Sequence, residues 1–316
     1  MKIAVLDDYQ EVAAGLADWK SLGGDVTVFN DHIADVEALV RRLAPFEIIC
    51  CMRERTPFPA SLLARLPNLK LLVTTGARNL SIDVAAASAR GVTVCGTGGG
   101  ASTEHQMTEF TWSLILALVR HIPAEDRGMR QGGWQTTLGT TLAGKTLGLV
   151  GVGRIGADVA RIGRAFAMKT IAWSPNLTPE RASKAEVDLV SKQDLFRQAD
   201  IVTVHMVLSD RSRGIVGADD LRLMKPTAYL INTSRGPLVV EAALLDCLRN
   251  KRIAGAALDV YDREPLPADH PLRRLDNVVI TPHIGFVTNE AYRTFYRDTV
   301  EDVRAFLDGK PIRVLK

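Results

Sequence analysis

The sequence predicts an α/β fold with parallel sheets, divided between two domains. Short apolar runs of strand type alternate with longer segments of helical period in both halves of the chain, a pattern typical of parallel sheets covered by helices. At 316 residues, 47% of them hydrophobic, the chain is long enough to build two cores of ordinary size. We therefore expect two α/β domains.

The first hundred residues hold five apolar runs that we predict to be strands of one parallel sheet. Between the second and third runs, Val36, Leu39, Val40 and Leu43 recur at helical spacing, with polar residues on the other face. This half should form one compact α/β domain. The predicted strands are residues 2–7, 26–29, 47–52, 69–75 and 92–96.

A glycine-rich run separates the two alternating halves. Residues 96–100 read Gly-Thr-Gly-Gly-Gly, which is too permissive for a strand or a helix, and we interpret the run as an interdomain hinge. A long apolar helix is predicted directly after it, from Glu104 to Val119. The domains should close about this hinge when a substrate binds.

A second alternation follows, and its six strands suit a doubly wound parallel sheet. The strands are predicted at residues 146–150, 169–173, 200–204, 227–232, 254–258 and 277–280. An amphipathic helix is predicted near residues 290–307, and its apolar face holds Val300, Val303, Phe306 and Leu307.

The net charge and the lengths of the apolar stretches argue against several classes of partner. A formal net charge of +3 without a basic run gives no reason to expect nucleic acid or a membrane surface. The longest apolar stretches are too short or too interrupted to span a bilayer. We expect no nucleic acid and no membrane partner.

The amino terminus and the cysteines bear on location and metals. The opening MKIAVLDDYQ meets two aspartates too early for a signal peptide, so we expect the protein to stay in the cytoplasm. Cys50 and Cys51 are adjacent in an apolar run, which fits a buried strand better than a disulfide framework. No CxxC or HExxH spacing occurs, and we expect no metal site.

A glycine motif provides the first functional signal. Gly151, Gly153 and Gly156 follow the apolar run TLGLV and open a helical segment, with Arg154 and Ile155 between them. The first glycine permits a tight turn, the second lets the backbone approach a pyrophosphate, and the third lets the helix pack close to the strand. The helix N-terminus offers free N–H groups to the phosphates, and Arg154 can add a charged contact. This context predicts a dinucleotide site.

The next strand leaves the choice of dinucleotide open. An NAD site usually carries Asp or Glu about 20 residues after the glycines, but here the strand ends in Ser174. Without that carboxylate NADP is admissible, although Pro175 and Asn176 supply no positive charge. Arg181 and Lys184 are either close enough to help or ordinary solvated helix residues. The predicted cofactor is NAD or NADP.

Three predicted strands end in residues suited to acid-base chemistry. Arg235, Asp259 with Glu264, and His283 each follow an apolar strand, and the carboxyl ends of parallel strands share one edge of the sheet. Reduction of a 2-oxo acid needs a cation for the substrate carboxylate and a proton donor, roles that Arg235 and His283 fit. Glu264 would stabilise and orient the protonated imidazole, and Asp259 would accept from a nicotinamide carboxamide.

Each of these residues also has an ordinary structural explanation. His283 could cap a loop, Arg235 could serve a structural ion pair, and Asp259 and Glu264 could be turn residues. Taken together, behind a nucleotide motif, they favour function.

The motifs resemble those of the D-isomer-specific 2-hydroxyacid dehydrogenase family. The resemblance rests on the glycine block, NTSRG, GAALDVYDREPLP, TPHIG and the loop TTGARNLSID, and it covers nearly the whole chain. It implies a Rossmann-type doubly wound nucleotide domain at 100–286, inserted in a smaller flavodoxin-like α/β substrate domain made of 1–99 and 287–316. It also implies a homodimer.

The resemblance assigns roles to individual residues. Arg235, Glu264 and His283 match the catalytic trio, and Gly76 with Ala77 match the loop whose N–H groups receive the substrate carboxylate. Further matches are the cofactor contacts His205, Thr233 and Asp259.

The chain also departs from the family pattern. Arg78 and Asn79 stand where smaller or different residues are usual, and CGTGG replaces an NTPG-like turn. Arg78 either holds a second anionic group of the substrate or points into solvent. Lactate, glycerate, glyoxylate, hydroxypyruvate and phosphoglycerate chemistries all stay open, and we expect no appended regulatory domain.

Two rival functions use the same fold. Relatives known as C-terminal-binding corepressors are protein-interaction modules that sense the nicotinamide cofactor, and this is the main alternative. A formate dehydrogenase is the other, disfavoured by the different loop and by the lack of a longer N-terminal extension.

Overall fold

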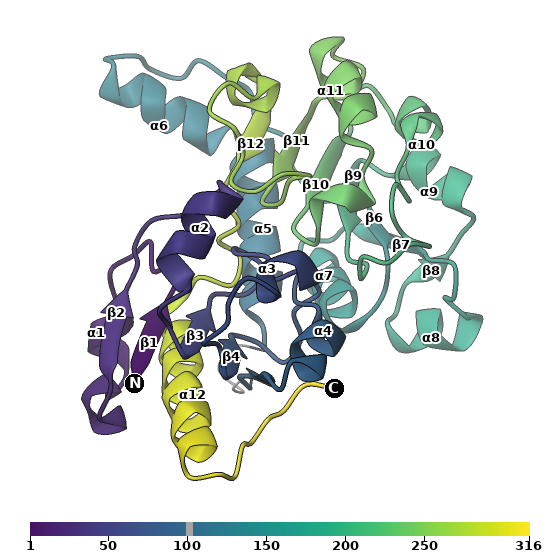
Figure 1. Ribbon diagram of the computed structural model, residues 1–316. Helices are drawn as coiled ribbons and strands as arrows, with labels where there is room; N and C mark the ends of the chain where they lie inside the picture. Colours follow the sequence, from purple (N-terminus) through teal and green to yellow (C-terminus); the bar gives the residue numbers. More distant parts are fainter. Residues whose placement is uncertain (99–103) are drawn as a thin grey trace. The chain divides into compact units, whose positions relative to one another are not determined.

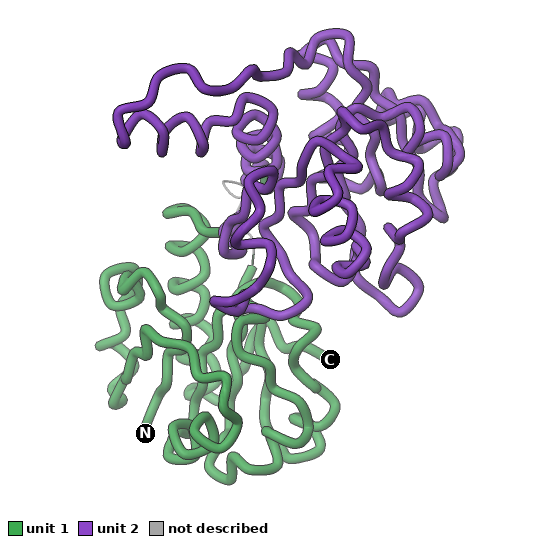
Figure 2. Tube along the Cα trace, turned by 90° about the horizontal axis from the view of Figure 1, so that it is seen from above, with its two compact units in different colours: residues 1–104, 287–316 green, residues 105–286 purple. Residues whose placement is uncertain are grey.

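The computed structural model describes residues 1–98 and 104–316. The chain divides into two compact units, which Figure 2 shows in different colours. Unit 1 consists of Met1–Glu104 and Val287–Lys316, and unit 2 consists of His105–Phe286. Gly99 and Gly100 of the glycine run lie outside the described residues, so the hinge stays a prediction.

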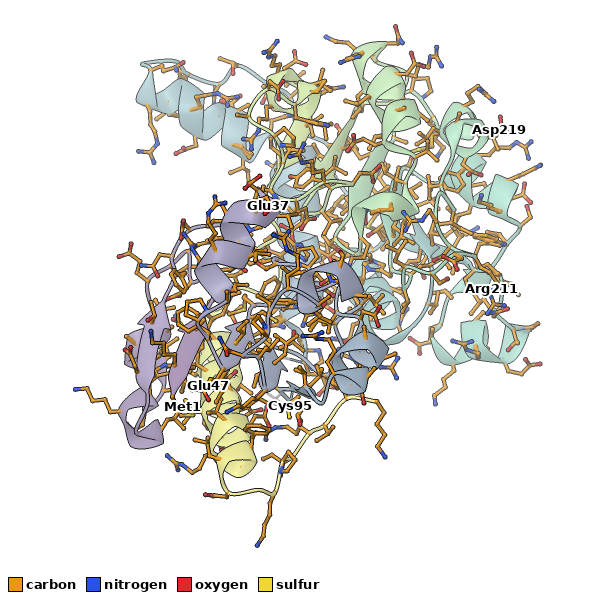
Figure 3. All side chains as sticks on the ribbon, viewed as in Figure 1. Met1, Glu37, Glu47, Cys95, Arg211 and Asp219 are labelled. Atoms are coloured by element: carbon orange, nitrogen blue, oxygen red, sulfur yellow. The ribbon has the colours of Figure 1, made fainter. Side chains whose placement is uncertain are left out.

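Unit 1 is built on a five-stranded parallel sheet in the order β2-β1-β3-β4-β5. All four residues of β3 and of β4 are buried, as expected for central strands covered on both faces. Met1 and Glu47 lie beside each other at the amino-terminal edge of the sheet (Figure 3), with 3.8 Å between the terminal ammonium and the carboxylate. The strands are β1 (Lys2–Val5), β2 (Asp25–Val28), β3 (Ile48–Cys51), β4 (Leu71–Thr74) and β5 (Thr93–Gly96).

Helices from both ends of the chain cover this sheet (Figure 1). The predicted helix at 36–43 is present as α2, where Leu39 and Leu43 are buried and Val36 is exposed. The long C-terminal helix α12 packs against β4 and β5. The helices are α1 (Ala13–Leu16), η1 (Trp19–Leu22), α2 (Val36–Leu43), α3 (Ala60–Leu63), α4 (Val84–Ala89) and α12 (Asn289–Leu307).

The predicted apolar face of α12 is correct in its middle and wrong at its end. Val300 and Val303 are buried, but Leu307 is 44% exposed because it is the last helical residue before the chain turns at Gly309. Beyond that turn, Val314 pairs with Cys95 as an antiparallel bridge at the edge of the sheet.

Unit 2 carries a seven-stranded parallel sheet in the order β12-β11-β10-β9-β6-β7-β8. Six strands occur where predicted, and β8 is an additional strand of two exposed residues. The order reverses between β6 and β9, which makes their carboxyl ends the switch point of a doubly wound sheet. The strands are β6 (Thr146–Val150), β7 (Lys169–Trp173), β8 (Asp188–Leu189), β9 (Ile201–Val204), β10 (Tyr229–Asn232), β11 (Gly255–Leu258) and β12 (Val278–Ile280).

The central strands of unit 2 bury both faces. Along β10, Leu230 belongs to one core cluster and its neighbour Ile231 to the other, so helices are required on both sides. Ile115 of α5 packs in the second cluster and Leu244 of α11 in the first. The helices are α5 (Gln106–Val119), α6 (Ile122–Arg130), α7 (Arg154–Ala165), α8 (Pro179–Lys184), α9 (Lys192–Gln198), α10 (Ala218–Leu223), η3 (Gly236–Leu238), α11 (Glu241–Arg249) and η4 (Pro271–Arg274).

Two searches of the described residues bear on membranes and metals. None of their helices is long and apolar enough to cross a membrane. Within residues 1–98 and 104–316, no group of three or more His, Cys, Asp or Glu side chains could hold a metal ion.

Candidate active site

The glycine turn between β6 and α7 lies at the switch point of the unit 2 sheet. Gly151 has φ +103°, and a Cβ added to it would lie 2.5 Å from the His205 carbonyl oxygen. A Cβ on Gly156 would lie 2.3 Å from the Gly151 carbonyl oxygen. Both positions therefore require glycine, one for the tight turn and one for close packing of the helix.

Gly153 differs, because a Cβ there would have no atom within 4 Å. It is the N-cap residue of the 12-residue helix α7 and faces open space, whereas Ile155 packs against the core below. Arg154 is exposed at the first position of the helix. The N-terminus of α7 and an open approach over Gly153 fit a pyrophosphate, so this turn could hold a dinucleotide.

His205 follows β9 and lies against the glycine turn. Its backbone N–H donates to the Val150 carbonyl at 2.8 Å, and its ring Nε2 lies 2.9 Å from the Thr203 hydroxyl. Burial lowers the pKa of His205 to about 4 because the charged imidazolium is poorly solvated there. The imidazole is therefore neutral at physiological pH.

Ser174 stands directly after β7, with Arg181 close by. The Arg181 guanidinium donates to the Asn176 carbonyl at 3.2 Å, so this cation reaches back to the turn that Ser174 begins. Lys184 is exposed on the same short helix, α8. Of the two cations considered from sequence, Arg181 is the one that the structure brings to the turn after β7.

Thr233 and Arg235 follow β10. The Thr233 hydroxyl is buried 2.9 Å from that of Thr111, which itself donates to the Met107 carbonyl, so Thr233 is the donor of the pair. Arg235 is partly buried, and its Nη1 donates to the Ser234 carbonyl at 2.7 Å. Both side chains therefore start from a segment fixed at the carboxyl end of the sheet.

Asp259, at the end of β11, holds the turn that follows β12. Its Oδ1 accepts from the Thr281 hydroxyl at 2.6 Å and from the Ile284 N–H at 2.9 Å, and its Oδ2 accepts from the Gly285 N–H at 2.9 Å. Burial raises the pKa of Asp259, and these three donors oppose that effect. The structure thus gives Asp259 a role that the sequence did not suggest, since both oxygens anchor residues 281–285.

The predicted acid-base pair is assembled. His283 Nδ1 lies 2.5 Å from Glu264 Oε2, and the other carboxylate oxygen accepts the Tyr261 backbone N–H at 2.9 Å. His283 itself has φ +53°, an uncommon backbone conformation for a residue with a side chain. Tyr261 is not recognisable as a site residue from the sequence, because an aromatic residue just after a strand reads as core.

The predicted carboxylate loop lies after β4 in unit 1. Gly76 has φ +88°, and its N–H donates to the Thr97 hydroxyl at 2.7 Å, so this donor is already engaged. Ala77 and Arg78 are exposed, whereas Asn79 is buried and donates to the Arg53 carbonyl at 2.6 Å. Asn79 therefore shapes the loop, and the exposed residues are the ones placed to meet a ligand.

The glycine turn and the Glu264–His283 pair share the carboxyl edge of one parallel sheet, which indicates a dinucleotide-binding protein with a candidate proton-transfer site. Residues 112–285 match the family model described as "D-isomer specific 2-hydroxyacid dehydrogenase, NAD binding domain". The chain belongs to the D-isomer-specific 2-hydroxyacid dehydrogenase family, as the motifs predicted. The predicted cofactor class, NAD(P), is confirmed with it.

Similar proteins carry several substrate names. A D-3-phosphoglycerate dehydrogenase of Archaeoglobus fulgidus is 36% identical over 282 residues, covering 88% of this chain and 52% of that protein. A glyoxylate reductase of Aeropyrum pernix is 40% identical over 258 residues, 79% of this chain and 76% of the relative. The crystal structure of a phosphoglycerate oxidoreductase from Vibrio cholerae O395 aligns with a TM-score of 0.92 at 41% identity, over 98% and 99% of the two chains. The chain thus spans about half the length of the Archaeoglobus fulgidus protein.

Proposed function

We propose that the protein is an NAD(P)-dependent D-2-hydroxyacid dehydrogenase that interconverts a small 2-oxo acid and the corresponding 2-hydroxy acid. The observation that carries the proposal is the 2.5 Å contact between His283 Nδ1 and Glu264 Oε2, on the sheet edge that also bears the glycine turn. A carboxylate held against an imidazole fixes the orientation of the ring and stabilises its protonated form.

The pair leaves one ring nitrogen for chemistry. Because Nδ1 faces Glu264, Nε2 is the nitrogen that gives a proton to the substrate oxygen in reduction and takes it back in oxidation. Arg235 supplies the positive charge for the substrate carboxylate and for charge that develops on the carbonyl oxygen. In this reaction a carbonyl at C2 becomes a hydroxyl, with the proton coming from His283.

The nicotinamide cofactor, when bound, supplies or accepts the hydride. Gly151, Gly153, Arg154, Ile155 and Gly156 would bind its pyrophosphate by the turn geometry described above. The neutral His205 and the Thr233 hydroxyl would contact its nicotinamide half, and Ser174 its adenosine ribose. Asp259 would contact the carboxamide through the one lone-pair site on Oδ2 that its three present donors leave.

The substrate class remains a small 2-oxo acid. The loop of Gly76, Ala77 and Arg78 is the proposed carboxylate-binding segment, and the exposed Arg78 offers a cation for a second anionic group. Glyoxylate, hydroxypyruvate and 3-phosphohydroxypyruvate span the range from no distal group to a phosphate.

A homodimer in the cytoplasm is part of the same proposal. The segment from Ile122 to Leu138 supports self-association, because helix α6 buries none of its residues. Trp134 is 72% exposed and Leu138 is 94% exposed, an arrangement that a second subunit would cover. Light scattering during gel filtration gives the mass, and Trp134→Ser should shift it toward the monomer.

Oxidation of NADH and NADPH by the purified protein, against glyoxylate, hydroxypyruvate, pyruvate, phenylpyruvate and 3-phosphohydroxypyruvate, tests the proposal. Turnover with one of these acids that is lost in Arg235→Ala supports it. No turnover across the set, with NADH still bound, contradicts it and favours a cofactor-sensing interaction module, which would bind a protein partner differently with and without NADH.

A further inference from the structure

The side chain of Tyr261 joins the ends of two strands. Its hydroxyl donates to the Thr281 carbonyl at 2.8 Å, and the Leu258 carbonyl lies 3.1 Å from the same oxygen. Leu258 ends β11, and Thr281 follows β12 directly. The ring is buried, so the hydroxyl has no bulk water to replace these acceptors.

Tyr261 also contacts the carboxylate of the acid-base pair. Its backbone N–H donates to Glu264 Oε1 at 2.9 Å, which leaves Oε2 for His283. A carboxylate held at one oxygen by the main chain presents the other in a fixed direction.

A second path leads from Tyr261 to His283. The Thr281 carbonyl that accepts the Tyr261 hydroxyl also accepts the His283 backbone N–H at 3.1 Å. His283 has φ +53°, a conformation that persists only when its surroundings hold it. The Tyr261 hydroxyl thus fixes the carbonyl on which this turn closes.

The main chain of Tyr261 is packed against the arginine segment as well. A Cβ added to Gly236 would lie 2.0 Å from the Tyr261 carbonyl carbon and 2.2 Å from its oxygen. Gly236 is the residue after Arg235, so the backbone that carries the arginine rests directly on Tyr261. The segments of all three candidate catalytic residues therefore converge on this one tyrosine.

We propose that Tyr261 is the positioning residue of the active site, aligning Glu264 and His283 through its backbone N–H and its hydroxyl. The proposal rests on the proposed dehydrogenase function and adds a residue to it. Tyr261 takes no part in proton transfer itself, because its hydroxyl is directed at two backbone carbonyls.

Tyr261→Phe tests the hydroxyl, since it keeps the ring and the backbone N–H. We expect kcat for the 2-oxo acid to fall about 3- to 30-fold with KM changed less than about twofold, because proton transfer is impaired and ground-state binding is not. The pH dependence of kcat/KM should also change on the limb that reports the catalytic acid. Tyr229→Phe is the matched control, a buried tyrosine at the amino end of β10, and it should leave kcat and the profile unchanged.

A spectroscopic readout separates this inference from the dehydrogenase proposal. The proton between His283 Nδ1 and Glu264 Oε2 should give a downfield proton NMR resonance in the protein without cofactor, absent in Glu264→Gln and broadened or lost in Tyr261→Phe. If the resonance is lost in Tyr261→Phe but the wild type turns over no 2-oxo acid, the positioning role of Tyr261 stands and the proposed dehydrogenase function is refuted. A folded Tyr261→Phe with unchanged kcat, pH profile and resonance would overturn the inference, even if its Tm were lower.

If Tyr261→Phe does not fold, 3-fluorotyrosine at position 261 replaces it. Its fluorine resonance should shift when His283 is changed to Asn, because the two residues share the Thr281 carbonyl. No shift would overturn the inference.

Discussion

Oδ2 of the buried Asp259 accepts the backbone N–H of Gly285 at 2.9 Å, two residues beyond His283. The other carboxylate oxygen accepts from the Thr281 hydroxyl and the Ile284 N–H, so the turn is anchored on both sides of the histidine. A residue expected from sequence to meet the cofactor thus holds the turn that carries His283 in place.

Asp259→Asn should destabilise this turn. An amide has one oxygen, so one of the three donors would face an NH2 group, and such a loss costs about 1–3 kcal/mol. We expect a lower free energy of unfolding in urea and a turnover reduced at least about tenfold. A variant as stable and as active as the wild type would show that the anchoring is unimportant.

His283→Ala should lower turnover by roughly two to four orders of magnitude, the usual scale for losing a general acid. NADH affinity, measured by fluorescence, should stay unchanged. His270→Ala is the control, because His270 also lies against a carboxylate, with 3.2 Å between its Nε2 and Glu241 Oε1. Comparable losses of turnover in both variants would contradict the proposed role of His283 as the general acid.

Gly151 and Gly153 should respond differently to alanine. Gly151→Ala places a Cβ 2.5 Å from a backbone oxygen at φ +103°, so we expect the free energy of unfolding to fall by about 1–3 kcal/mol or more. Gly153→Ala meets open space and should change stability by less than about 0.5 kcal/mol, yet weaken NADH binding about tenfold or more by filling the approach to the pyrophosphate. Equal dissociation constants for Gly153→Ala and the wild type would contradict the assigned binding mode.

The partly buried His205 predicts a dependence of stability on pH. Its pKa is lowered from 6.5 to about 4 in the folded protein, so below pH 6.5 the unfolded chain takes up a proton that the folded protein does not. This group's contribution to stability is therefore lost as the pH falls from 6.5 toward 4, by about 2 kcal/mol between pH 7 and pH 5.

Urea unfolding of the wild type and His205→Gln at both pH values isolates this term. The comparison is needed because the buried Asp302 acts in the opposite direction: burial raises its pKa to about 7, which favours the folded state as the pH falls. The loss of stability on acidification should be smaller in His205→Gln. If the two proteins lose the same stability on acidification, a neutral His205 in the folded state is contradicted.

Ser174 predicts how the cofactor preference can be changed. Ser174→Asp places a carboxylate at the end of β7, where it can accept from a ribose hydroxyl and repel a 2′-phosphate. The ratio of NADPH to NADH dissociation constants should rise at least about tenfold. Arg181→Ala should weaken NADPH alone if its guanidinium, near the Asn176 carbonyl, grips that phosphate. Equal effects on both nucleotides would exclude that contact.

The strands were predictable because those of a covered parallel sheet are continuous apolar runs, as β3 and β4 are. Strand β8 escaped prediction because both of its residues are exposed and it has only two, and helix α6 because it is only nine residues long and buries none of them.

Candidate site residues can be chosen from the sequence where the proposed chemistry fixes the residue type. The proposed reaction calls for a cation, an acid and an imidazole, which Arg235, Glu264 and His283 would supply, and the sheet brings Glu264 and His283 into contact. Tyr261 could not be found this way, because its role lies in where its backbone and hydroxyl point. Asp259 was singled out, but its grip on Thr281, Ile284 and Gly285 depends on a register that no spacing in the sequence reveals.

Because unit 1 is divided between the two ends of the chain, its parts are translated at different times. Helix α12, which packs against β4 and β5, is translated only after all of unit 2. At roughly 5–20 residues per second, the nascent five-stranded sheet waits about 10–40 s with that face uncovered, while unit 2 already has its whole sequence. Unit 2 can therefore fold completely before unit 1, whose two segments flank it in the sequence.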